Sequence, residues 1–127
     1  MNKPLPPPPR LKPRAPQVFV VHSMTDPGAK KPRQDLTPAE NFGELVFINS
    51  RYVYGDEMEE GIPKQFRDRL VEAVRKFRPE DDFMLITGDH LQVVTLAALL
   101  ARAHKRFRVL RYDRQLRGYL PVLIDAA

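Results

Sequence analysis

The residues best placed for chemistry are Gly88, Asp89 and His90, which follow an apolar segment and open a long apolar helix pattern. A glycine at a strand-to-helix turn lets a ligand approach the backbone, and the amides at a helix N-terminus attract phosphate. Asp89 places a carboxylate at the same point. That carboxylate could ligate a metal ion or ligand, or it could cap the helix and complement the helix dipole. The sequence favours capping, because a single Gly-Asp pair is only a weak signal of a metal-binding or ligand-binding site.

A metal site at this position needs a second acidic group. Four acidic residues between 56 and 60 follow a predicted strand, so they could lie at the same sheet edge as Asp89. Magnesium requires only one or two carboxylates. Residues 80–82 are also acidic, but they precede a strand and belong to the opposite edge. Zinc is disfavoured, since cysteine is absent and His90 has no second histidine at ligand spacing. We expect no metal and no cofactor.

The positive charge of the chain lies mainly in its first 34 residues. They hold seven Lys or Arg and one Asp, whereas residues 35–127 hold fourteen Lys or Arg and fifteen Asp or Glu. Seven prolines fall within residues 1–16, a composition that cannot build a core. We predict a disordered, proline-rich basic arm over residues 1–16 and a single domain over residues 17–127. The arm could bind phosphates, dock on a partner protein or act as a spacer.

A second basic group runs from Arg102 to Arg117, with Tyr112 and Tyr119 nearby. Arginines interleaved with aromatic rings suit phosphate contact combined with base stacking. Strand parity divides these residues between two faces, and charges on an edge hairpin also prevent strand-to-strand aggregation. The candidate nucleic-acid-binding residues of the arm, its basic loop and the hairpin are Lys3, Arg10, Lys12, Arg14, Lys30, Lys31, Arg33, Arg108, Arg111, Arg114 and Arg117.

Alternating strands and helices must position these residues. The hydrophobic patterns predict strands over 18–21, 44–48, 83–87, 107–112 and 119–124, and helices over 63–78 and 91–103, with a short helix from Thr37. Thr37 and Glu40 have capping-box spacing. This order indicates an α/β, small three-layer Rossmann-like domain with a mostly parallel sheet. Two right-handed crossovers would place strands 44–48, 83–87 and 107–112 side by side.

The last predicted strand, 119–124, forms a hairpin with its predecessor and contains Pro121, which lacks an amide donor. It therefore lies antiparallel at the sheet edge. In such sheets ligands bind beyond the carboxyl ends of the strands, where Gly88 falls. The helix over 91–103 is apolar on nearly every side. We expect it to pack on the sheet and also against another subunit or strand 18–21, so a homo-oligomer is a hypothesis.

Parts of the chain resemble two known protein families. Residues 82–110 resemble part of NYN/PIN-type nuclease domains, in which a strand ends in Gly-Asp before a helix; here His22 and Ser23 stand where those domains carry a further acidic residue. Thr37 to Gly43, Gly88-Asp89, Val109 to Arg114 and Tyr119 to Val122 are similar to a family of small α/β proteins of tailed phages, over about residues 35–125. That second resemblance implies a phage context and no particular activity.

The sequence thus predicts a non-catalytic, phage-associated accessory protein that contacts DNA, RNA or a protein partner. One alternative is a metal-dependent nuclease or phosphodiesterase that uses Asp89 with Asp56 or Glu57. Another is a structural or assembly protein that uses its proline-rich arm. No apolar run approaches the ~20 residues of a membrane span, and no apolar leader opens the chain. We therefore expect no membrane contact and a cytoplasmic location in the host cell.

Overall fold

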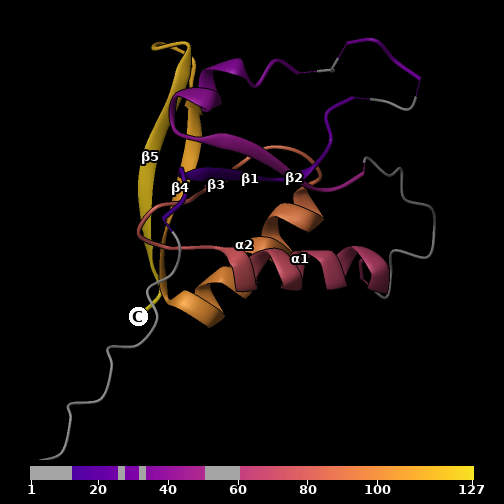
Figure 1. Ribbon diagram of the computed structural model, residues 1–127, viewed down its shortest axis with the longest axis vertical. Coiled ribbons are helices and arrows are strands. Elements are labelled where there is room, and N and C mark those ends of the chain that lie inside the picture. The colour runs from indigo at the N-terminus through magenta and orange to yellow at the C-terminus, as the bar shows by residue number, and fades with distance from the viewer. Residues whose placement is uncertain (1–12, 26–27, 32–33, 51–60) are drawn as a thin grey trace, which may run out of the picture.

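The computed structural model describes residues 13–25, 28–31, 34–50 and 61–127, which form one five-stranded sheet with two α-helices on one face and a short 3-10 helix on the other (Figure 1). The strand order is β2-β1-β3-β4-β5. In chain order the elements are β1 (Gln17–His22), the 3-10 helix η1 (Thr37–Asn41), β2 (Glu44–Asn49), α1 (Lys64–Lys76), β3 (Phe83–Leu85), α2 (His90–His104), β4 (Arg106–Asp113) and β5 (Gly118–Asp125).

The first four strands are parallel, and β5 pairs antiparallel with β4. The prediction of an α/β domain with a mostly parallel sheet and an antiparallel edge strand is therefore confirmed. One expected pairing is wrong, because β1 lies between β2 and β3. Residues 18–21 of β1 are each 3% exposed or less. A strand that is apolar at every position is most stable where both of its faces are covered, and this places β1 inside the sheet.

Pro121 explains why β5 can end the sheet. The backbone N–H of Ala126 donates to the carbonyl of Lys105 at 2.7 Å, and hydrogen-bonded pairs alternate along an antiparallel ladder. Pro121 lies opposite Leu110, at a position whose N–H would point away from β4. The missing donor therefore costs no ladder hydrogen bond, and it interrupts the free edge.

The main core lies between the sheet and helices α1 and α2, which sit together on one face (Figure 1). From α1 the buried residues are Phe66, Leu70, Ala73 and Val74, the single stripe that helical spacing predicts. Phe19 of β1 and Phe107 of β4 reach this core from the sheet. Phe19 also packs against Phe77, directly after α1, with ring centroids 5.4 Å apart.

A smaller core covers the opposite face of the sheet, where η1 supplies the third layer. Leu36 and Ala39 pack there against Val18, Val20 and other sheet residues. The expected capping box at Thr37 is wrong, because Leu36 occupies the N-cap position and no side chain caps this helix. The hydroxyl and the amide of Thr37 both donate to Asp35 Oδ1 instead. Asp35, two residues earlier, thus binds the Thr37 hydroxyl, which a capping box would need to cap the helix.

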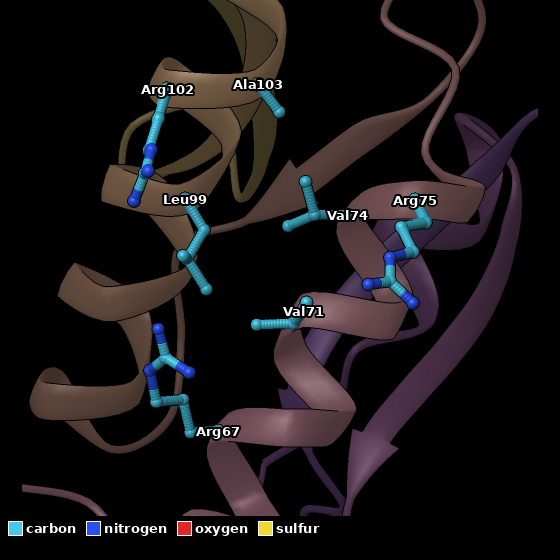
Figure 2. Close-up of a pocket in the computed structure, with 7 residues that line it drawn as sticks. All are labelled: Arg67, Val71, Val74, Arg75, Leu99, Arg102 and Ala103. Atoms are coloured by element: carbon cyan, nitrogen blue, oxygen red, sulfur yellow. The ribbon is translucent and has the colours of Figure 1, made fainter.

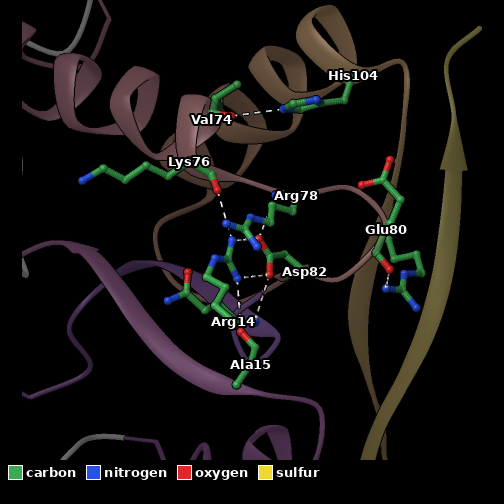
Figure 3. Close-up of polar contacts among 10 residues, drawn as sticks. Arg14, Ala15, Val74, Lys76, Arg78, Glu80, Asp82 and His104 are labelled. Atoms are coloured by element: carbon green, nitrogen blue, oxygen red, sulfur yellow. Dashed lines mark hydrogen bonds and ion pairs between the residues drawn. The ribbon is translucent and has the colours of Figure 1, made fainter. Parts of the chain in front are cut away.

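The segment before β1 is fixed to the domain by an ion pair between Arg14 and Asp82 (Figure 3). The Asp82 side chain is fully buried and accepts from both Nη atoms of Arg14, from the amide of Gln17 at 3.0 Å and from the amide of Arg78 at 2.7 Å. Burial tends to raise the pKa of Asp82, but these four hydrogen bonds outweigh it and hold that pKa below its usual value. The pair joins the segment before β1 to the residue directly before β3.

Candidate functional site

The strand order reverses between β1 and β3, so the edge beyond their carboxyl ends is where an α/β sheet usually binds a ligand. His22 ends β1, and Gly88 and Asp89 follow β3. The structure thus brings the sequence-predicted residues Gly88, Asp89 and His90 to the expected edge. It also adds His22, which lies far from them in sequence.

Gly88 has a structural role at this edge, because the backbone passes close to His22 there. Its φ is +101°, and a Cβ at this position would lie 2.9 Å from both His22 Nε2 and Val21 Cγ2. The amide of Asp89 donates to His22 Nε2 at 2.9 Å. Because Nε2 is the acceptor, the ring proton lies on Nδ1 and is donated to the carbonyl of Ser23 at 2.9 Å. Only glycine allows this approach without strain.

Asp89 caps α2, as the capping interpretation predicted. Its Oδ2 accepts from the amide of Gln92 at 2.9 Å, and its carbonyl accepts from the amide of Val93. A carboxylate here also complements the positive end of the helix dipole. His90 is exposed as the first residue of the helix.

Sequence reasoning missed a buried polar pair beside this edge. Asn49, at the end of β2, and Gln92, in the first turn of α2, are 3% and 0% exposed. Asn49 Nδ2 donates to Gln92 Oε1 at 3.0 Å and to the carbonyl of Phe66 at 3.2 Å. The pair ties β2, α1 and α2 together. A glutamine on an otherwise apolar stretch of helix was the available signal, since such a residue must find a polar partner when it is buried.

A pocket of about 240 Å³ adjoins the end of β1 and is lined in part by Ser23, Thr25 and Thr37. The charged side chains among its described lining residues are both acidic, Asp35 and Glu40. Hydrogen bonds from the hydroxyl and amide of Thr37 lower the pKa of Asp35, so this carboxylate stays ionised at neutral pH. Two negative charges in the lining disfavour a phosphate-bearing ligand at this edge.

No group of three His, Asp or Glu side chains in the described ranges is arranged to hold a metal ion. The acidic residues 56–60 invoked for a magnesium site lie outside the described residues, so that site remains a prediction. Likewise, within the part of the chain that the structure covers, no helix is long and apolar enough to cross a membrane.

The basic residues of the β4–β5 hairpin are placed very differently. β3 pairs only with residues 108–110 of β4, so the hairpin from residue 111 onward extends past the end of β3. Arg111, Arg114 and Arg117 in this extension are exposed and make no ion pair with any other described residue. Tyr112 is 47% exposed and packs edge-on against Tyr119, with ring centroids 5.4 Å apart.

Other residues predicted to bind nucleic acid are engaged elsewhere or lie outside the described ranges. The Arg108 guanidinium lies over the Phe83 ring, 4.2 Å from its centroid, and donates to the carbonyl of Glu80. Arg14 is held by Asp82. Lys30 and Lys31 are exposed. The remaining predicted residues, Lys3, Arg10, Lys12 and Arg33, fall outside the described part of the chain.

A family model described as Phage Pam3 gp32-like protein matches residues 16–126. The chain belongs to this phage protein family. The match confirms the resemblance to a phage family that the sequence motifs indicated, and it gives no support to the NYN/PIN resemblance. No curated protein and no solved structure matches the chain.

Proposed function

We propose that this member of the phage Pam3 gp32-like family is a non-catalytic accessory protein that contacts nucleic acid through its β4–β5 hairpin. The observation that carries this proposal is a set of exposed arginines on the hairpin extension that make no ion pair with any described residue, Arg111, Arg114 and Arg117. Each can neutralise a backbone phosphate and release a counterion, the dominant source of nucleic-acid affinity. The half-exposed Tyr112 can add stacking on an unpaired base.

The hairpin carries two acidic residues, and neither forms an ion pair with Arg111, Arg114 or Arg117, so three arginines face one aspartate in the extension. Asp113 Oδ1 accepts from the amide of Leu116 at 3.0 Å, which closes the turn. Asp125 pairs with Arg106 at 3.2 Å, at the other end of the hairpin. The basic arm that the sequence predicts over residues 1–16 would add further phosphate contacts through Lys3, Arg10 and Lys12.

The roles of Gly88 and Asp89 support a non-catalytic protein. The glycine admits His22, and the carboxylate caps α2, so both residues have structural reasons to be present. The acidic side chains of the pocket next to the end of β1 disfavour a phosphate ligand near the edge where an α/β enzyme would bind one. Nucleic-acid contact through the hairpin requires neither residue.

The test is fluorescence anisotropy with labelled duplex DNA, single-stranded DNA and RNA of about 20 nucleotides, between about 50 and 200 mM salt. The double variant R114E/R117E should bind at least about tenfold more weakly and lower the salt slope by about 2, one for each lost phosphate contact. The matched control R67E/R102E changes net charge equally but lies between α1 and α2, and it should retain most of the affinity.

A variant lacking residues 1–12 measures the contribution of the arm and retains Arg14. It should bind more weakly and with a smaller salt slope. Equal losses in the two double variants would show that net charge, rather than the hairpin, governs binding. Absence of binding at the lowest salt would contradict the proposal, and magnesium-dependent cleavage of the strands would contradict its non-catalytic part.

A further inference from the structure

A groove of about 410 Å³ runs between α1 and α2 on their surface facing away from the sheet (Figure 2). Val71 and Val74 of α1 and Leu99 of α2 point into it and form an apolar floor. The floor is continuous with the main core, because Val74 belongs to that core and Leu99 packs against it. Ala103 also lines the groove and contributes only a methyl group, so the space between the helices is not filled at that end.

Three arginines surround this floor. Arg67 and Arg75 come from α1 and Arg102 from α2, and Figure 2 shows their guanidinium groups around the apolar side chains. None of the described residues that line the groove is acidic. Arg75 donates to Glu72 at 3.4 Å, but both side chains are more than half exposed, so this pair contributes little. Arg67 and Arg102 make no ion pair with another described residue.

An apolar floor bordered by exposed guanidinium groups complements a ligand that is apolar on one face and carries carboxylates on both sides of that face. Arginine binds a carboxylate through two parallel hydrogen bonds, which fixes orientation as well as charge. A helix with apolar residues at i, i+3, i+4 and i+7 and acidic residues beside them has this chemistry. We propose that the groove between α1 and α2 binds an acidic amphipathic helix of a partner protein.

Two other occupants complement the groove less well. A second copy of this chain, packed through a twofold contact at the groove, would present the same arginines to one another, and the like charges would repel. Nucleic acid would satisfy the arginines, but it would leave the valine and leucine floor facing phosphates. Among the described residues that line the groove there is no aromatic side chain to stack on a base. The helix-binding groove does not depend on the hairpin proposal, since the two sites share no residue.

The experiment uses the full chain and a labelled, acetylated peptide of about 18 residues, with leucines at i, i+3, i+4 and i+7 flanked by glutamates. A second peptide has the same composition in an order that breaks the apolar stripe. We expect saturable binding of the first peptide, with a dissociation constant of about 100 μM or below, and at least tenfold weaker binding of the second. Amide chemical shifts should change along α1 and α2.

The variant R67E/R102E should weaken peptide binding by at least about tenfold, whereas R114E/R117E should change it by less than about twofold. Because all four arginines are exposed, both variants should remain folded, and circular dichroism checks this. A third variant, V71D, places a charge in the apolar floor of the groove and should also weaken peptide binding. Three outcomes would overturn the proposal: no saturation by about 1 mM, equal binding of both peptides, or equal losses in the two double variants. If R67E/R102E lost affinity for nucleic acid but kept its affinity for the peptide, the groove would be a nucleic-acid site instead.

Discussion

Replacing Arg14 by alanine should destabilise the whole domain, although Arg14 precedes the first strand. Its guanidinium makes a two-pronged ion pair with the fully buried Asp82 carboxylate and also donates to the carbonyl of Lys76 at 3.1 Å. Removing one partner of a buried ion pair costs about 3–5 kcal/mol, mainly because the other charge is left buried. Here Asp82 keeps two amide donors, and the Arg14 side chain is 24% exposed, so water can reach the vacated space. We therefore expect Arg14→Ala to lower the free energy of unfolding by about 2–3 kcal/mol.

Urea unfolding followed by circular dichroism measures this loss. For a domain of this size, 2–3 kcal/mol corresponds to a fall of roughly 1–2 M in the unfolding midpoint with an unchanged slope. A double-mutant cycle of R14A, D82A and R14A/D82A isolates the pair, with an expected coupling energy of about 2 kcal/mol at pH 7. The variant R14K tests geometry, since it keeps the charge and loses the two-pronged contact.

The coupling energy between Arg14 and Asp82 should also depend on pH, so the same double-mutant cycle can be repeated at several pH values. Hydrogen bonds from Arg14 and two amides lower the pKa of Asp82 in the folded protein against the opposing effect of burial. A carboxyl group whose folded pKa is depressed stabilises the fold fully above its unfolded pKa, about 3.9, and loses this contribution as pH falls through the folded pKa. The coupling energy should stay constant from pH 7 to about pH 5 and shrink below about pH 4. A coupling energy below about 0.5 kcal/mol at pH 7 would contradict this prediction, because Arg14 and Asp82 would then behave as a surface ion pair.

Two further predictions concern the edge beyond β1 and β3. Gly88→Ala should cost about 2–3 kcal/mol, because a Cβ would lie 2.9 Å from His22 at a φ of +101°; Gly61→Ala, at a similar φ of +104° with no described atom within 4 Å, should cost about 1 kcal/mol. Equal midpoint shifts in urea would show that φ strain alone matters. Asp89→Ala should cost about 1 kcal/mol through loss of the cap, and Asp89→Asn should retain most of the stability. A loss above about 3 kcal/mol in Asp89→Asn would mean that the charge itself is needed.

The sequence by itself determined the features that depend on neighbouring residues. The hydrophobic pattern over residues 63–78 predicted an amphipathic helix, and α1 buries Phe66, Leu70, Ala73 and Val74 along one stripe. Pro121 predicted an edge strand, and β5 lies at the edge. Asp89 predicted a helix cap, and it caps α2. Each of these patterns acts within one turn, strand or helix, so the residues that carry the signal also form the structure.

The tertiary structure alone decided which distant residues meet. Arg14 and Asp82 are 68 positions apart, and Asn49 and Gln92 are 43 apart, yet both pairs are buried or partly buried hydrogen-bonded contacts. These contacts depend on the place of β1 inside the sheet, where sequence order suggested that β2 would adjoin β3. The groove between α1 and α2 likewise combines residues of two helices that only the sheet brings together. The order of the strands depends on how much apolar surface the whole chain buries. Every residue contributes to that burial, so a local sequence pattern does not specify the strand order.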